Sequence, residues 1–276
     1  MAFFDEDYDI LPKSDITSHP FLPSGESFMH IAVCLCQVPD TSSVISFVEG
    51  VIDLSRVNEM MNPYDEYALE EAVRLKEQFE GSVVTLFCIA PPSAREMLRK
   101  ALAMGGDRAF LLSITEYLDT FQTASLLSRA ITACYGEALP DLVFCGKHST
   151  DFQSAQVPLM LAERLGIESV SAIIKLEATA DSIKVEREIE GGTESLDVHY
   201  PALFSVEKGI NVPRKTTIKA VMAARKKPVD LLPVIISENP YVTITSIKPL
   251  VREKKCTIVQ DAKELVRLLR NEKALF

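Results

Sequence analysis

Short apolar runs alternate with longer amphipathic stretches between residues 29 and 165. The apolar runs lie at 30–38, 83–90, 108–114 and 141–145. They lack a consistently polar face, which predicts strands that are covered on both sides by helices. The amphipathic stretches lie at 65–79, near 93–104, at 120–135 and at 153–165. Apolar residues recur on one side of each of them, which predicts helices.

The helix predicted at 65–79 carries an apolar stripe made of Ala68, Ala72, Leu75 and Phe79. Asn62 is a natural N-cap for it, and Pro63 suits the first helical position. Four strands that alternate with four helices predict the α/β class, as an open, mainly parallel sheet with flanking helices of the Rossmann-like type. The loops that follow 30–38, 83–90 and 141–145 then share one edge of the sheet, where such folds bind ligands.

The last third of the chain changes character. The segments 172–176 and 182–188, joined around 179–181, predict a hairpin, and 193–200 with 202–206 adds further extended chain. We expect these segments to form a β-rich layer beside the main sheet. Near the C-terminus, a short strand is expected at 257–259 and a helix from 261 to about 270.

Three regions are expected along the chain. Residues 1–28 mix acids, Pro and Ser without periodicity, which indicates a flexible extension. Residues 29–228 form the α/β domain, and its basic stretch 214–227 contains six basic residues and no acid. Residues 229–276 are too apolar for a linker and are expected to lie across another chain as a C-terminal arm.

Composition excludes several classes of protein. The net charge is −10, which disfavours a nucleic-acid binder. Six scattered cysteines form no CxxC pair and have no His at metal-ligand spacing, so we expect no metal site and a cytoplasmic location. No segment is apolar for long enough to cross a bilayer.

Residues 143–165 contain the most informative local pattern. An apolar run ends at Gly146, a polar loop follows, and an amphipathic stretch carries Gln156. A parallel strand that leads into a helix N-terminus directs unpaired backbone N–H groups at one point, which suits a phosphate. Gly146 permits close backbone approach, and Ser154 and Gln156 can donate hydrogen bonds. Asp151 is expected to cap the helix or to accept from ribose or backbone N–H groups.

Other interpretations of these residues stay open, most of them purely structural. Cys34 and Cys36 suit ordinary buried strand positions, and Gln156 suits a helix surface. His148, Ser149 and Asp151 suggest a hydrolase triad, but residues in one short loop do not easily adopt relay geometry, and no G-x-S-x-G motif is present.

Five ordered blocks resemble the β-subunit of an electron-transfer flavoprotein. They are AVCLCQVPDT (32–41), MNPYDEYALEEAVRLKE (61–77), CGKHSTDFQSAQV (145–157), VEREIEGGTESLDVHYPALFSV (185–206) and MAARKKP (222–228). The resemblance implies an adenine-nucleotide-binding α/β fold, similar to the adenine-nucleotide α-hydrolases, and a heterodimer whose α-subunit holds most of a redox-active FAD. It also implies a buried nucleotide in this chain, either AMP or a second FAD. The role that it implies is that of an electron carrier, not an enzyme, which accepts electrons from an acyl-CoA dehydrogenase or a related dehydrogenase.

The resemblance also transfers site residues, position by position. The nucleotide pocket would comprise Cys34, Asn62, Pro63, Tyr64, Asp65, Ile89, Ala90, Gly146, Lys147, Asp151, Gln153, Ser154, Ala155, Gln156 and Val157. Tyr64 would approach the partner's flavin. A partner-recognition segment near 208–227 would dock the dehydrogenase through Ile218, flanked by Arg214, Lys215 and Lys219.

Two features leave the nucleotide open. The loop 151–159 lacks the glycines of members that bind a second FAD, and Ala155 and Val157 replace the Asn and Thr of AMP-type members. The loop is similar to branches associated with anaerobic carnitine metabolism and nitrogen fixation. A stand-alone ATP- or AMP-binding enzyme or sensor of the same fold is the alternative, although no Walker-like or G-x-G-x-x-G run is present.

Overall fold

The computed structural model describes residues 28–48, 51–53, 55–249 and 256–273. The extension predicted for residues 1–28 lies outside the described residues except for Phe28. The chain divides into two units, which we describe separately: Met1–Val44 with Ser55–Thr243, and Ile45–Leu54 with Ile244–Phe276.

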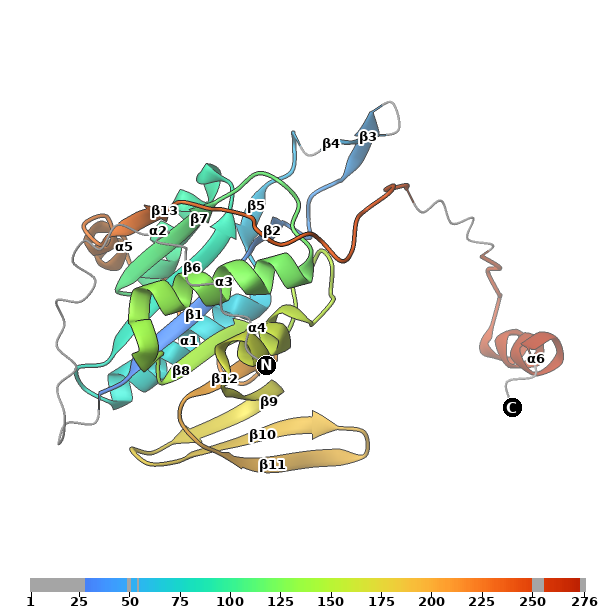
Figure 1. Ribbon diagram of the computed structural model, residues 1–276. Helices are drawn as coiled ribbons and strands as arrows, with labels where there is room; N and C mark the ends of the chain where they lie inside the picture. Colours follow the sequence, from blue (N-terminus) through green and yellow to red (C-terminus); the bar gives the residue numbers. More distant parts are fainter. Residues whose placement is uncertain (1–27, 49–50, 54, 250–255, 274–276) are drawn as a thin grey trace. The chain divides into compact units, whose positions relative to one another are not determined.

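The first unit is built on a mixed sheet, for which nine strands are found in the described residues (Figure 1). Its order is β11 (Gly192–Val198), β10 (Ile183–Ile189), β9 (Glu168–Ala178), β12 (Ala202–Val206), β8 (Leu142–Gly146), β1 (His30–Leu35), β6 (Val83–Ala90), β7 (Arg108–Ser113) and β13 (Val229–Leu232). From β9 to β13 all neighbours are parallel, and only β10 and β11 run antiparallel to theirs. The predicted α/β class is confirmed.

Helices cover both faces of this sheet. They are α1 (Pro63–Gln78), α2 (Arg95–Met104), α3 (Thr120–Tyr135) and α4 (Val157–Leu165), while the short helix α5 (Ile218–Ala224) packs on α2. One buried cluster joins α1 and α2 to alternate residues of β1, namely Ile31, Val33 and Leu35. A second joins α3 and α4 to Ala32 and Cys34 on the opposite face. The central strands β1, β6 and β8 lack a polar face because each side packs against helices.

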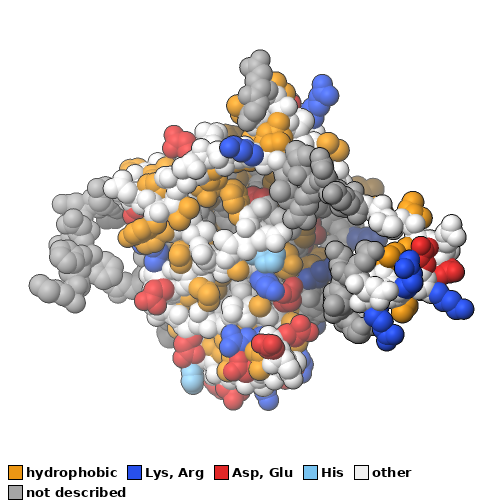
Figure 2. Space-filling model, turned by 90° about the vertical axis from the view of Figure 1, so that its right-hand side faces the viewer, with side chains coloured by type: hydrophobic (Ala, Val, Ile, Leu, Met, Phe, Trp, Pro, Cys, Tyr) orange, Lys and Arg blue, Asp and Glu red, His pale blue; other side chains and the backbone are white. Residues whose placement is uncertain are grey.

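The predicted β-rich layer is wrong in one respect. β9 to β11 do form the expected antiparallel chain, but β9 pairs in parallel with β12 and therefore extends the main sheet. Figure 2 shows acidic and basic side chains mixed over the lower part of the view, at the height of β10 and β11 in Figure 1. The ion pairs Lys175–Glu186 and Arg187–Glu194 lie on these strands.

Two predicted element boundaries are also wrong. The strand expected over 30–38 breaks at Cys36, and β2 (Gln37–Pro39) then pairs with β5 (Glu59–Met61) in a small antiparallel sheet. The helix expected from 153 begins at Val157, since Gln153 and Ala155 have φ of 54° and 55°. Those values belong to the left-handed region, which a right-handed helix cannot contain.

The second unit contains the hairpin of β3 (Ser46–Val48) and β4 (Val51–Asp53), and the helix α6 (Ala262–Lys273). The helix expected from 261 is confirmed. The strand expected at 257–259 is wrong, because those residues pair with no strand in the described part of the chain. Among the described residues, no helix has the length and apolarity that a bilayer crossing requires.

Candidate functional site

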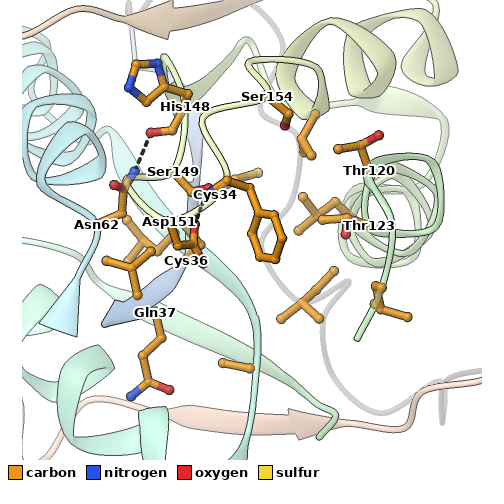
Figure 3. Close-up of a pocket in the computed structure, with 18 of the residues that line it drawn as sticks. Cys34, Cys36, Gln37, Asn62, Thr120, Thr123, His148, Ser149, Asp151 and Ser154 are labelled. Carbon is orange, nitrogen blue, oxygen red and sulfur yellow. Dashed lines mark hydrogen bonds between the residues drawn. The ribbon is translucent and has the colours of Figure 1, made fainter. Parts of the chain in front are cut away.

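A cavity of about 590 Å³ lies at the carboxyl ends of the parallel strands. Its walls include the ends of β1, β6 and β8, as the alternation of strands and helices predicts. Figure 3 shows Asn62 and His148 on one side of it, and Thr120, Thr123 and Ser154 on the other. Cavities that hold small molecules commonly measure about 300–1,000 Å³.

Most of the predicted pocket residues line this cavity. They are Cys34, Asn62, Asp65, Ile89, Ala90, Gly146, Asp151, Ser154, Ala155, Gln156 and Val157. The other four lie beside it: Lys147 pairs with Glu207 at 2.5 Å, and Tyr64 packs its ring against His148 with centroids 4.4 Å apart. Pro63 is the first residue of α1, and Gln153 lies in the loop before α4.

Asp65, in the cavity wall, joins three segments of the chain. Its Oδ2 accepts from the amide of Cys36 at 2.7 Å, and its Oδ1 accepts from the amide of Gly146 at 3.1 Å and from Asn62 Nδ2 at 2.9 Å. Burial raises the pKa of Asp65 to about 6, although these hydrogen bonds oppose the shift. The side chain therefore joins the ends of β1 and β8 to the first turn of α1.

Gly146 is required by this arrangement. A Cβ at this position would lie 2.3 Å from Asp65 Oδ1 and 2.7 Å from Tyr64 Cβ. The sequence suggests that the glycine admits a ligand, but the space that a side chain would fill is occupied by α1. What the glycine allows is close packing of the helix against β8.

Asn62 occupies the predicted N-cap position without capping the helix through its side chain. Its Nδ2 instead donates to Asp65 Oδ1 and to the carbonyl of His148 at 3.0 Å (Figure 3). Its Oδ1 is buried and has no hydrogen-bond partner in the described chain. The Asn62 side chain therefore ties the start of α1 to the loop at His148.

The loop before α4 presents backbone N–H groups. Ala155 is left-handed and Gln156 is right-handed, an alternation that turns successive amides toward one point. The amides of Ser154 and Ala155 donate no hydrogen bond within the described residues. Asp151 does not cap α4, which begins six residues later, but accepts from the amide of Phe152 at 2.8 Å. The loop and the helix N-terminus together suit an anion.

One wall of the cavity was missed by the sequence analysis. It consists of the segment 114–120 after β7, together with Thr123, Leu127 and Val242. Asp119 begins α3 with a capping box, accepting from the amide of Gln122 at 2.8 Å. It also accepts from the amides of Tyr241 and Val242 at 2.6 and 3.0 Å. The D-x-x-Q pattern was a signal for this helix start.

The cavity wall contains acids but no Lys or Arg among the described residues. The carboxylates are Asp65, Glu116, Asp119 and Asp151. Amides and hydroxyls are therefore the groups that this wall offers to an anion, which disfavours a highly charged triphosphate.

Two cysteines of the wall, Cys36 and Cys145, are held as thiols. Burial, followed by the neighbouring Asp65, raises the pKa of Cys36 well above its ordinary value. A hydrogen bond with Cys34 and burial raise the pKa of Cys145 in the same way. Such thiols are poor nucleophiles. Within the described residues, no cluster of three or more His, Cys, Asp or Glu is arranged to hold a metal ion.

The predicted docking residues lie away from the cavity, around the start of α5. Ile218 is 86% exposed, and Lys215 and Lys219 are exposed beside it. Arg214 differs from them, because its guanidinium pairs with Glu70 and Glu77 of α1.

Known proteins share this sequence pattern. The family model described as electron transfer flavoprotein domain matches residues 49–237. The chain is 40% identical over 208 residues to the electron transfer flavoprotein subunit beta of Thermoanaerobacterium thermosaccharolyticum, covering 74% of this chain and 78% of the relative. It is 34% identical over 263 residues to protein FixA of Sinorhizobium fredii, covering 88% and 92%.

A third relative is the acryloyl-CoA reductase electron transfer subunit gamma of Anaerotignum propionicum. It is 33% identical over 225 residues, covering 79% of this chain and 83% of the relative. The family match includes the loop before α4 and the basic segment 214–227, and it leaves out the cavity residues of β1. The chain belongs to the electron transfer flavoprotein family, in which it is a member of the β-subunit group.

Proposed function

We propose that this chain is the β-subunit of an electron-transfer flavoprotein heterodimer, in which it binds an adenine nucleotide and helps to place the FAD of an α-subunit. The observation that carries the proposal is the cavity at the carboxyl ends of β1, β6 and β8, with unpaired amides on one side. The FAD supplies the redox chemistry by accepting and releasing single electrons. No residue of this chain then has to act as a general acid or base.

The cavity residues have distinct parts in nucleotide binding. The amides of 154–157 and the start of α4 would hold phosphate. Asp65 and Gly146 would keep these segments in register without contacting the ligand. AMP and FAD share the adenylate part, so both satisfy this arrangement.

Tyr64 would take part in the flavin site of the partner. Its half-buried ring stacks at a tilt on His148 just outside the nucleotide cavity. An aromatic side chain placed there would exclude water and restrain the isoalloxazine of the α-subunit's FAD.

The exposed start of α5 would dock the electron donor. Ile218 offers an apolar contact, and Lys215 and Lys219 would steer a partner with an acidic surface. We propose an acyl-CoA dehydrogenase or a related dehydrogenase as this donor, in line with the name of the acryloyl-CoA reductase subunit. Free cysteines throughout the described chain accord with a reducing, cytoplasmic location.

Co-expression with an α-subunit from the same organism tests the proposal. We expect a yellow heterodimer that releases FAD and, after denaturation, either AMP or additional FAD. One AMP and one FAD per heterodimer identify the AMP type. Two FAD per heterodimer identify the type with a second flavin. A colourless monomer that ignores the α-subunit, or one that hydrolyses ATP, would contradict the proposal and favour the stand-alone enzyme or sensor.

Replacing Ile218 tests the docking part separately. Ile218→Ala should slow reduction by the acyl-CoA dehydrogenase and leave the flavin content unchanged. Ile189→Ala is the matched control, because Ile189 is also exposed but lies on β10. An unaltered rate in Ile218→Ala would remove the docking assignment.

A further inference from the structure

The exposed segment 215–223 is fastened to the fold at both of its ends. Before it, Asn211 Nδ2 donates to the carbonyl of Tyr67 at 3.0 Å and to Glu71 Oε2 at 2.8 Å, both on α1. After it, Ala224 is buried, and its carbonyl accepts from Arg99 of α2 at 2.9 Å. Between these attachments most of the side chains are exposed.

Arg214 makes the strongest attachment. Its amide and Nε donate to Glu70 Oε2 at 3.0 and 2.9 Å, and its Nη2 donates to Glu70 Oε1 at 3.0 Å. The same guanidinium donates to both oxygens of Glu77 at 2.6 and 3.0 Å. Glu70 is buried and Glu77 is largely exposed, and they lie seven residues apart on one face of α1. A planar guanidinium that is shared by two carboxylates fixes both position and orientation.

This geometry conflicts with a direct docking role for Arg214. Its donors are already directed at α1, and leaving Glu70 would strand a buried carboxylate without its cation. Lys215 and Lys219 have no ion pair in the described chain and remain available to a partner.

We propose that Arg214, Glu70 and Glu77 are positioning residues that hold the segment carrying Ile218 in its docking conformation. The proposal rests on the docking assignment made above. α1 would then serve both functional regions, since its first turn holds the loop of Gly146 and its later turns hold Arg214. A docking segment ordered in advance loses less conformational entropy when the partner binds.

Arg214→Lys tests the role, because lysine keeps one positive charge near Glu70 but cannot bind two carboxylates in a plane. In the purified heterodimer we expect amide hydrogen exchange over 211–222 to accelerate roughly tenfold. The KM for the acyl-CoA dehydrogenase should rise roughly fivefold, while the limiting rate and the flavin content stay unchanged. Glu77→Gln should cause smaller changes in the same direction, and it leaves the buried Glu70 paired.

Lys215→Ala is the control, since it removes a neighbouring charge without touching α1. Its exchange over 211–222 should match the wild type. Unchanged amide exchange in Arg214→Lys would overturn the positioning role. If Ile218→Ala raises the KM for the dehydrogenase and Arg214→Lys does not, the positioning role is overturned as well. If Ile218→Ala has no effect, the docking assignment fails instead, and the exchange measurement still decides whether Arg214 orders the segment.

Discussion

Single residues at the cavity act mainly on one another. Asp65 accepts from the amide of Cys36, between β1 and β2, and from the amide of Gly146 at the end of β8. Gly146 leaves room for its carboxylate. The side-chain NH₂ group of Asn62 donates hydrogen bonds to Asp65 and to the carbonyl of His148. These positions, which resemblance assigns to the nucleotide, thus hold the cavity walls in place.

Gly146→Ala should destabilise the chain by about 1–3 kcal/mol, because the new Cβ would collide with Asp65 and with the backbone of Tyr64. The nucleotide content of the purified heterodimer should fall with it. Gly192→Ala is the control, since a Cβ there meets no atom within 4 Å. Urea unfolding and nucleotide analysis check both expectations, and equal stability of the two variants would contradict the first.

Asp65→Asn should remove a pH dependence of stability. The pKa of Asp65 is raised by burial to about 6, while an unfolded aspartate titrates near about 4. Between these values the folded state binds more protons than the unfolded state, so this group's contribution falls as pH rises from about 4 to about 6. The stability of the wild type relative to Asp65→Asn should fall by up to about 3 kcal/mol over this interval and stay level above it. Parallel unfolding curves across pH 4–7.5 would contradict the assignment.

Elements meet at the cavity through their ends. β1, β6, β7 and β8 stop at the same edge, and α1, α3 and α4 begin there. The start of α3 is the most heavily bonded of these helix ends, because Asp119 caps its own helix and also holds the distant residues Tyr241 and Val242. One carboxylate therefore closes a wall of the cavity with chain from the far end of the unit.

Asp119→Ala should cost about 2–3 kcal/mol, from the lost cap and the two amides left without an acceptor. Burial raises the pKa of Asp119, but hydrogen bonds from Gln122, Val242 and Tyr241 outweigh it, so the pKa lies below its ordinary value. This contribution is present above the unfolded pKa of about 4 and is lost as pH falls through the folded value. Asp119→Asn should lose less, since its remaining oxygen can still accept from Gln122. Thermal unfolding of both variants at pH 7 tests this order.

At the scale of the whole molecule, the hydrophobic core belongs to the first unit. Both core clusters of the first unit lie within residues 29–236, and most described residues of 244–269 are exposed. The first unit therefore has the apolar contacts needed to fold without the second. This division differs from the predicted boundary at 228, because β13 still belongs to the sheet.

Deletion of 244–276 should leave the unfolding temperature of the remaining chain within a few degrees of the wild type, because it removes no residue of either core cluster. The yield of heterodimer with the α-subunit should fall sharply if those residues belong to the C-terminal arm that the sequence predicts over 229–276. Circular dichroism and size-exclusion chromatography measure the two effects. A truncated chain that assembles as well as the full chain would contradict the arm.

Periodicity predicted the strands, the helices that cover them and the edge at which their loops meet, because a strand buried on both faces and an amphipathic helix each leave a local pattern. The same local patterns misplaced the start of α4 and the pairing of β9. The left-handed conformations of Gln153 and Ala155 are not recognisable from residue type. The pairing of β9 depends on the position of β12 in the sheet, which no local pattern encodes.

The sequence alone determined the fold class and the family, since both depend on patterns that neighbouring residues or ordered blocks carry. Only the tertiary structure decided which residues face the cavity and which form hydrogen bonds or ion pairs with one another. Arg214 and Lys215 are adjacent basic residues, yet one is bound to α1 and the other is exposed. Their difference depends on carboxylates more than a hundred residues away, and contacts over such distances arise only when the chain packs.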